Sequence, residues 1–448
     1  MKIGFNRASG CLAAVLGVAI ALAWPVLANG FPFVFYDSAD YIEGAFTGQV
    51  PIFRALPYAL FLAPVRLPGG LWLPILIQIG LVALLLGLLA RRFKGGWPLF
   101  LALGLAAGGL SSASWYAGLL MPDIFAGIAI LGAILILTDG ESSALARLLL
   151  IALTALAAFL HATHLMVLIG LALVGLVLWR LSWIGRRGAL TLVGVALIVG
   201  LAIPSLHRLA AGEFTLNRGG TIFLLARTVE PGLLAAHLDR VCPQKPYRAC
   251  ALRDRLHGEE NDFLWGHGGV FFQDDEPLEI WRKEAAELLG AIVRENPGAA
   301  AAVVLKGAGR QFLSFGAGDV FTPMDYHMGH AVERHFPKAM ATFRNAGQEQ
   351  RWKAPLWLDR MGRAAGWASL LLVPLLSIWA LRKGERVAAL IGFLTLVALA
   401  GNALACGGLS SVADRYQARV LWVAVAVATA LLIRICRRRP AEPDSRAA

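Results

Sequence analysis

Long apolar runs alternate with short polar segments along most of the chain, and this pattern predicts a bundle of membrane-spanning helices. A run of roughly 17 to 25 apolar residues is long enough to cross the hydrocarbon core of a bilayer as an α-helix. We therefore expect an all-α polytopic membrane protein with about ten transmembrane helices. The ten runs lie near 9–29, 69–90, 97–117, 122–138, 145–160, 165–181, 188–206, 361–381, 387–405 and 418–435.

Two polar stretches interrupt this pattern. The first, residues 30–54, is acidic and precedes an apolar stretch near 55–66 that is too short to span, which predicts a helix lying in the membrane interface. The second contains most of the aspartates, glutamates and histidines. We expect a mixed or mainly helical polar domain there, between spans seven and eight. The predicted parts are an N-terminal membrane module (1–208), the polar domain (209–360) and a C-terminal membrane module with a short cytoplasmic tail (361–448).

Composition agrees with a membrane protein, since 58% of the 448 residues are hydrophobic and 16% are charged. The 41 Lys and Arg exceed the 29 Asp and Glu, for a net charge of +12. The basic residues form short clusters between apolar runs, which argues against a nucleic-acid partner and indicates cytoplasmic loops. The expected location is a bacterial inner (plasma) membrane, with an uncleaved first span and an extracytoplasmic polar domain. The clusters lie at 91–94, 186–187, 382–386 and 437–439.

The five cysteines divide into two groups. Cys11, Cys406 and Cys436 lie in or beside apolar runs and are expected to be inert. Cys242 and Cys250 lie in the polar domain, where an oxidising compartment favours a disulfide between them. A zinc site is the alternative, but no second Cys or His pair with ligand spacing lies beside them.

The first polar stretch contains two aspartates next to the membrane. Asp37 and Asp40 are three residues apart, so one turn of helix would place both carboxylates on the same face. Carboxylates beside a bilayer are costly to desolvate and often mark a site or a pathway. The alternative is a solvated loop in which Asp37 caps the next helix and Asp40 occupies position N3.

Two further candidates begin predicted spans. Asp123 follows Pro122 at the start of the fourth span, and its alternative role is to cap the positive end of the helix dipole. His161 and His164 share a helix face and could bind a phosphate or a metal. The alternative for both histidines is hydrogen bonding to the backbone.

Two arginines precede the last span. Arg415 and Arg419 are four residues apart and share a helix face. Arginines on the extracytoplasmic side oppose the positive-inside bias, so bidentate binding of an anionic head group is a good reason for them. An ion pair of Asp414 with Arg415 or a neighbouring residue is the alternative.

Three motifs together resemble the GT-C superfamily of integral membrane glycosyltransferases, and most closely its protein-mannosyltransferase and aminoarabinose-transferase type. They are Tyr36-Asp37-Ser38-Ala39-Asp40-Tyr41 after the first span, Met121-Pro122-Asp123 before the fourth and Asp414-Arg415-Tyr416 before the last. The resemblance covers the arrangement of residues 1–210 and the patch 409–420. The chain departs from better-known members in its smaller number of spans and in an Asp-x-x-Asp pattern where they have Asp-Glu.

The resemblance implies an inverting transferase that moves a hexosyl or pentosyl group from a polyprenyl-phosphate-linked donor to an extracytoplasmic lipid, glycan or protein. Asp37 would be the general base, and Asp40 or Asp123 would orient the acceptor. A divalent cation, Mg²⁺ or Mn²⁺, shared by Asp37 and Asp123 is left open as a cofactor. The implied ligands of the lipid phosphate are His161, His164, Arg415, Tyr416 and Arg419.

Other functions stay open from the sequence. A transporter or flippase of a lipid-linked or anionic substrate would need ionisable residues near mid-span, where Gln78 and Asn402 are the clearest polar side chains. A non-catalytic protein of cell-envelope assembly would tolerate substitution of the first-loop acids. A polymerase or ligase of lipid-linked glycans would share the donor chemistry.

Overall fold

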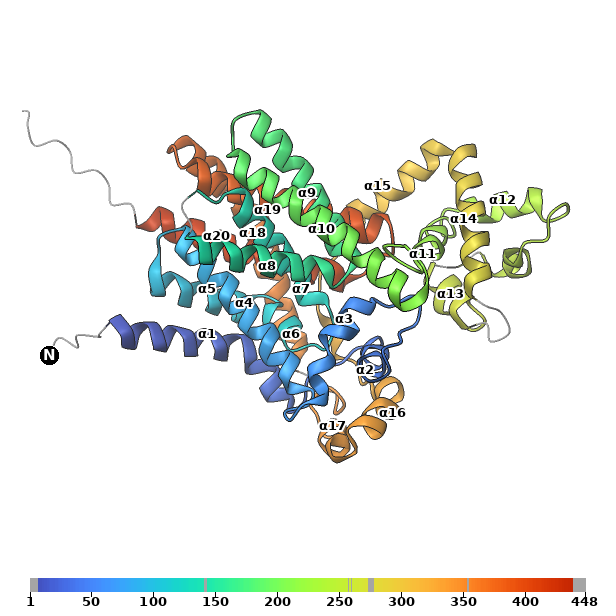
Figure 1. Ribbon diagram of the computed structural model, residues 1–448, viewed down its shortest axis with the longest axis horizontal. Helices are drawn as coiled ribbons and strands as arrows, with labels where there is room; N and C mark the ends of the chain where they lie inside the picture. Colours follow the sequence, from blue (N-terminus) through green and yellow to red (C-terminus); the bar gives the residue numbers. More distant parts are fainter. Residues whose placement is uncertain are drawn as a thin grey trace, which may run out of the picture.

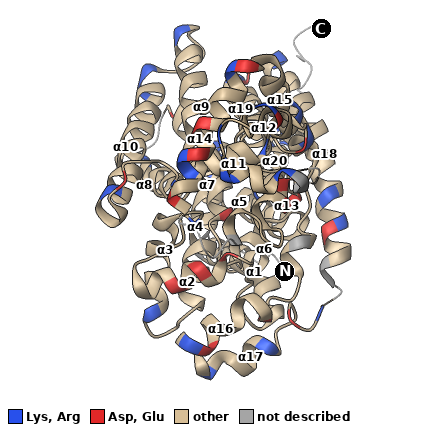
Figure 2. Cartoon of the chain, turned by 90° about the vertical axis from the view of Figure 1, so that its right-hand side faces the viewer, with Lys and Arg blue, Asp and Glu red and all other residues tan. Residues whose placement is uncertain are grey.

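The computed structural model describes residues 7–140, 143–256, 258, 260–272, 278–352 and 354–437. Within these ranges the protein is all-helical, and the only extended pairing is an isolated parallel bridge between Phe33 and Leu119. Figure 1 shows a bundle of long helices, with a smaller group of helices (α11 to α14) on one side and α16 and α17 beneath α2. Charged residues are sparse over the long helices and lie mainly at helix ends (Figure 2).

The N-terminal half contributes most of the bundle. Its elements are α1 (Arg7–Asn29), α2 (Ser38–Thr47), α3 (Leu56–Phe61), the 3₁₀ turn η1 (Ala63–Arg66), α4 (Trp72–Arg92), α5 (Gly96–Leu110), α6 (Ala113–Ala117), α7 (Asp123–Leu137), α8 (Ala144–Phe159), α9 (Ala162–Arg180) and α10 (Arg186–Ala211).

The polar region that follows is built from shorter helices. Its elements are α11 (Gly220–Ala226), α12 (Leu233–Val241), η2 (Arg248–Arg255), α13 (Glu260–Trp265), η3 (Val270–Phe272), α14 (Leu278–Glu295), α15 (Pro297–Leu313), η4 (Gly318–Phe321), α16 (Asp325–His335), η5 (Pro337–Ala339) and α17 (Met340–Arg344). The chain then returns to the bundle with α18 (Ala354–Arg382), α19 (Arg386–Ala403), the π-helical turn η6 (Leu404–Gly408) and α20 (Asp414–Cys436).

Seven helices in the described part of the chain are long and apolar enough to cross a membrane: α1, α4, α9, α10, α18, α19 and α20. An eighth span results if α14 and α15, which meet at 107°, are counted as one broken span. The structure is therefore that of a multi-pass membrane protein.

Three of the ten expected spans correspond to shorter apolar helices, α5, α7 and α8. The 15 residues of α7 extend about 22 Å, which is less than the roughly 30 Å of a hydrocarbon core. The expected span 97–117 is divided, because α5 ends at Leu110 and the backbone is extended at Ser111 before α6 begins. The count of about ten spans thus stays a prediction.

Helices α7 and α20 lie side by side in the interior of the bundle. Every residue of α7 is buried, and glycine allows its close contact with α20, since a Cβ at Gly127 would overlap the Trp422 ring. The packing of α7 against α20 brings the N-terminal ends of the two helices close to each other. Asp123 at the start of α7 and Arg419 in the second turn of α20 therefore lie next to each other.

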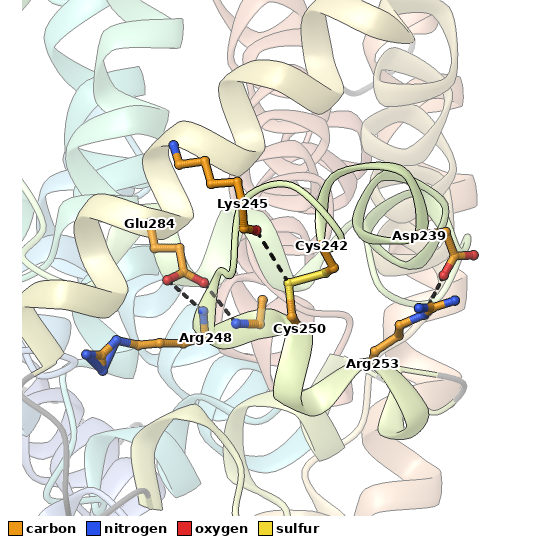
Figure 3. The surroundings of a disulfide bond; sticks show 8 residues. Asp239, Cys242, Lys245, Arg248, Cys250, Arg253 and Glu284 are labelled. Carbon is orange, nitrogen blue, oxygen red and sulfur yellow. Dashed lines mark hydrogen bonds and ion pairs between the residues drawn. A yellow bond between two sulfur atoms is a disulfide. The ribbon is translucent and has the colours of Figure 1, made fainter.

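The polar region divides into two packing units. The first has its own core around Trp281 on α14, and Cys242 and Cys250 form a disulfide on its edge (Figure 3). Beside the disulfide, the Glu284 carboxylate accepts hydrogen bonds from two backbone N–H groups. The second unit, α16 and α17, packs on α2 and joins the core of the bundle through Phe343.

The first polar loop is fastened to the chain that precedes α18. Gln348 is buried, and its amide exchanges hydrogen bonds with both backbone groups of Val34, at 3.2 and 2.8 Å. The Gln348 N–H also donates to the Asn29 side chain at 2.6 Å. These bonds fix the backbone that leads from α1 into Asp37.

Candidate functional site

Asp37 and Asp40 share one arginine. Asp37 lies at the N-cap of α2 but makes no side-chain cap hydrogen bond. Instead the Arg54 guanidinium contacts Asp37 at 2.9 Å and Asp40 at 2.7 Å. Burial raises the pKa of the Asp40 carboxyl, and the neighbouring Arg54 opposes this shift. The capping role considered for Asp37 therefore does not describe this loop.

Arg415 is held between aromatic rings beside Asp37. Its guanidinium lies 3.9 Å from the Asp37 carboxylate and stacks over the rings of Phe35, at 4.2 Å, and Tyr416, at 4.9 Å. One of its nitrogens, Nη2, donates to the Tyr416 hydroxyl at 3.4 Å, whereas Nη1 is buried without a partner. Asp414, the alternative partner from the sequence, pairs instead with Arg363 at 3.1 Å.

Arg419 forms the buried centre of the site. Its Nη1 donates to Asp123 at 3.3 Å, and its Nη2 donates to the Thr163 hydroxyl at 3.3 Å and contacts the Cys406 sulfur at 3.2 Å. A buried ion pair contributes little to stability on balance, since desolvation offsets the attraction between the charges. Stability alone is therefore a weak reason for this pair, and ligand binding by Arg419 stays a prediction.

The two histidines at the start of α9 have fixed tautomers. The Thr163 N–H donates to His161 Nδ1, which leaves the His161 proton on Nε2. Burial and the nearby Arg419 lower the pKa of His161 to about 4. His164 Nδ1 donates to the Ala157 carbonyl at 2.9 Å, and its Nε2 is buried without a partner. Both histidines thus make the local hydrogen bonds of the alternative interpretation, and each keeps one ring nitrogen for another group.

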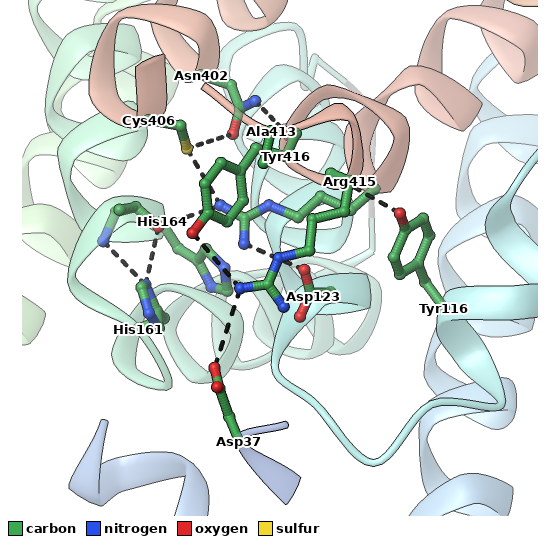
Figure 4. A network of polar contacts seen from close by, with 12 residues as sticks. Asp37, Tyr116, Asp123, His161, His164, Asn402, Cys406, Ala413, Arg415 and Tyr416 are labelled. Carbon is green, nitrogen blue, oxygen red and sulfur yellow. Dashed lines mark hydrogen bonds and ion pairs between the residues drawn. The ribbon is translucent and has the colours of Figure 1, made fainter. Parts of the chain in front are cut away.

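Four segments that are distant in sequence meet at this site. In Figure 4 the side chains of Asp37, Asp123, His164 and Arg415 lie around one region, with Arg415 between the two aspartates. Asp40 joins this network through Arg54. The disulfide lies elsewhere, in the unit around α14.

Sequence reasoning missed Arg54, which organises the first-loop acids. Arg54 carries the same signal as Arg415, since the expected parity of spans places it on the extracytoplasmic side against the positive-inside bias. Sequence reasoning also missed Gln311 on α15, which is buried and bonds both backbone groups of Ala413 at 2.8 and 3.0 Å. Gln311 thereby fixes the start of α20, but a lone glutamine in a helix has no pattern that predicts this.

The residues present do not fit a divalent cation shared by Asp37 and Asp123. Each carboxylate is already paired with an arginine, and Arg415 lies between them. Among the described residues, no three His, Cys, Asp or Glu side chains are grouped so as to hold a metal ion.

The mid-span polar residues are used for packing. Gln78 accepts a hydrogen bond from the Tyr58 hydroxyl and donates to the carbonyls of Ala117 and Leu119. Asn402 donates to the Tyr416 carbonyl at 2.8 Å and so connects α19 to α20. These bonds account for both amides without a transported ion.

Comparison of the chain with family models, with curated proteins and with solved structures gives no match.

Proposed function

We propose that the protein is a GT-C-type membrane glycosyltransferase that moves a sugar from a polyprenyl-phosphate-linked donor to an extracytoplasmic hydroxyl acceptor. The observation that carries this proposal is the contact between Asp37 and Arg415, whose side chains are 3.9 Å apart. The Nη1 atom of the same arginine is buried and has no partner. A carboxylate and an unsatisfied cation in one buried place are what base catalysis and phosphate departure require together.

In the proposed step, the acceptor hydroxyl oxygen attacks the anomeric carbon of the donor and its proton passes to the Asp37 carboxylate. The bond between that carbon and the phosphate oxygen breaks, and its electron pair leaves with the lipid phosphate. A single displacement of this kind inverts the anomeric centre. No other reactant is needed.

Arg415 would stabilise the charge that develops on the departing phosphate. Its Nη1 is available for a phosphate oxygen, and the stacked rings of Phe35 and Tyr416 hold the guanidinium plane in place. Donors that are already oriented need little reorganisation when the charge forms. Arg419 Nε is a further buried donor without a partner in this region, and Tyr416 positions Arg415.

The remaining charged groups would support these two residues. Arg54 fixes Asp37 and Asp40 together, so that Asp40 orients the acceptor next to the base. Arg419 and Asp123 form a buried pair behind Arg415, and Thr163 connects Arg419 to His161. This arrangement fits a donor in the outer leaflet of a bacterial inner membrane, with the acceptor arriving from the extracytoplasmic side.

The test is a comparison of a deletion strain with its complemented parent. We expect the lipid A, surface glycan or glycoprotein profile of the deletion strain to lack one sugar, and purified protein to restore it from a lipid-linked donor. A lipid-linked donor that accumulates unreacted on the cytoplasmic face of the deletion strain would instead support a flippase. Unchanged profiles in all three classes would contradict the transferase.

A further inference from the structure

A small cleft lies beside the site, between the segment before α3, the end of α8 and the link from α10 to α11. Its polar lining consists of Arg54, His161, His207, Asn217 and Arg218. No carboxylate is among its described lining residues, and its other walls are mainly apolar. The cleft therefore offers a partly apolar surface that is rich in hydrogen-bond donors and shares Arg54 with Asp37 and Asp40.

His207 presents a hydrogen-bond acceptor in this cleft. The residue is 4% exposed, and its Nδ1 lies 2.6 Å from the Thr215 carbonyl oxygen. A carbonyl only accepts, so Nδ1 carries the proton and Nε2 of the neutral ring has a free lone pair. Nε2 is buried and has no partner. A buried polar atom left in this way calls for a ligand group that donates to it.

The other polar groups of the cleft donate. His161 carries its proton on Nε2, because its Nδ1 accepts from the Thr163 N–H. Arg218 Nε is buried without a hydrogen bond, and its nearest ion-pair partner, Glu213, is 3.7 Å away. Glu213 lies closer to Arg282, at 2.7 Å, so the Arg218 charge is only partly compensated. The cleft thus combines donors that can bind an anion, from His161 and Arg218, with one acceptor, His207 Nε2.

We propose that this cleft binds the phosphate monoester of an amphiphile. A monoester has anionic oxygens for Arg54, Arg218 and His161, and it can share a proton with His207 Nε2, because its second pKa lies near 6. A phosphodiester has no such proton to offer. The apolar lining of the cleft, which includes Phe53, Phe159 and Leu216, would accompany the first part of an acyl or isoprenoid chain.

The cleft would also have a role in the reaction, and this role rests on the proposed function. The donor is a phosphodiester, and sugar transfer converts it to a lipid phosphate monoester. The cleft would then receive the leaving lipid after transfer, with Arg54 connecting it to Asp37. The preference for a monoester is a property of the cleft alone and can be measured without turnover.

The experiment is a calorimetric titration of the purified full-length protein in maltoside detergent. The probes are dodecyl phosphate, its methyl diester and inorganic phosphate. We expect dodecyl phosphate to bind at least about tenfold more tightly than the diester, since a charge-assisted hydrogen bond contributes about 1.5–3 kcal/mol. Inorganic phosphate should bind more weakly still, because it lacks the chain. Equal affinity for the two esters would overturn the proposal, and tight binding of inorganic phosphate would overturn its lipid part.

Two variants locate the binding. Arg218→Ala should weaken dodecyl phosphate binding by about tenfold or more, whereas the control Arg310→Ala, on the half-exposed Arg310–Glu230 pair, should leave it unchanged. In His207→Gln, the glutamine can turn either the oxygen or the nitrogen of its amide toward the ligand. The ratio of the affinities for monoester and diester should therefore fall toward one. Unchanged binding and preference in both variants would overturn the site. Retained binding in a transfer-inactive Asp37→Asn variant would separate this inference from the proposed function.

Discussion

The Arg419 guanidinium lies 3.3 Å from the Asp123 carboxylate, with side-chain exposures of 3% and 2%. The pair joins the start of α7 to the start of α20, two helices that pack together inside the bundle. The site is thus built on rigid, buried elements, with the first polar loop closing over it through Asp37. Such an arrangement positions charged groups more precisely than exposed loops do.

Breaking this pair should destabilise the protein. Arg419→Met leaves the Asp123 carboxylate buried without its partner, so we expect the free energy of unfolding to fall by about 3–5 kcal/mol. The double variant Asp123→Leu/Arg419→Met removes both charges and should regain most of that stability while transfer stays lost. Unfolding in detergent with a denaturant series measures this. A single variant as stable as the wild type would contradict the prediction.

Asp37→Asn should abolish transfer without unfolding the protein. The amide keeps the shape of the carboxylate but cannot take the acceptor proton, so we expect activity to fall by about 10²–10⁴-fold. Sugar transfer from a lipid-linked donor is the assay, and the melting temperature reports folding. Asp239→Asn, on an exposed ion pair with Arg253, is the matched control. Wild-type activity in Asp37→Asn would refute the base assignment.

Arg415→Lys should not replace arginine. Lysine lacks the planar guanidinium that stacks over Phe35 and Tyr416, and it lacks the forked donors that match a phosphate. We expect turnover to fall by about 10²–10³-fold, as when an oriented donor to a developing anion is removed. Steady-state kinetics with varied donor measures the effect on kcat separately from KM. The exposed Arg360→Lys is the control, and equal turnover in the two variants would remove Arg415 from the chemistry.

His161 should make the protein less stable in acid. Its folded pKa of about 4 lies below the ordinary value of 6.5, so the unfolded chain binds this proton first as the pH falls. Stability contributed by the neutral ring is therefore complete above pH 6.5 and declines between pH 6.5 and 4, by at most about 3 kcal/mol. His161→Asn keeps a side chain that caps α9 but does not titrate. On acidification the free energy of unfolding of the wild type should therefore fall relative to that of the variant, as measured by denaturant unfolding. A difference between the two proteins that does not change with pH would contradict this prediction.

Cys242 and Cys250 should be oxidised in protein isolated from cells. An oxidising compartment preserves such a disulfide, whereas the cytoplasm reduces it, so the bond also reports on which side the polar region lies. In a variant whose other three cysteines are replaced by serine, a maleimide should label these two thiols only after reduction. Labelling without reduction would place this region in the cytoplasm.

Much of the architecture follows from local sequence. Nine of the ten apolar runs form one main helix each, and the run 97–117 forms two, because burial of a long apolar segment is favourable whatever its neighbours are. The sequence also indicates the charged candidates at the ends of these runs, because a charged side chain beside a bilayer is costly to desolvate and is therefore rare without a function. Asp37, Asp123, Arg415 and Arg419 were each identified in this way.

The partners of those charges were decided by the tertiary structure. Capping of α2 by the Asp37 side chain and pairing of Asp414 with Arg415 are reasonable local alternatives. In the structure, however, Asp37 pairs with Arg54 and Asp414 pairs with Arg363. Likewise the polar region divides into two units, because α16 and α17 find their apolar partners on the bundle. Hydrophobicity acts on each segment separately, whereas an ion pair depends on which helix ends meet. That meeting is set by packing between α7 and α20, through residues such as Gly127 that have no charge at all.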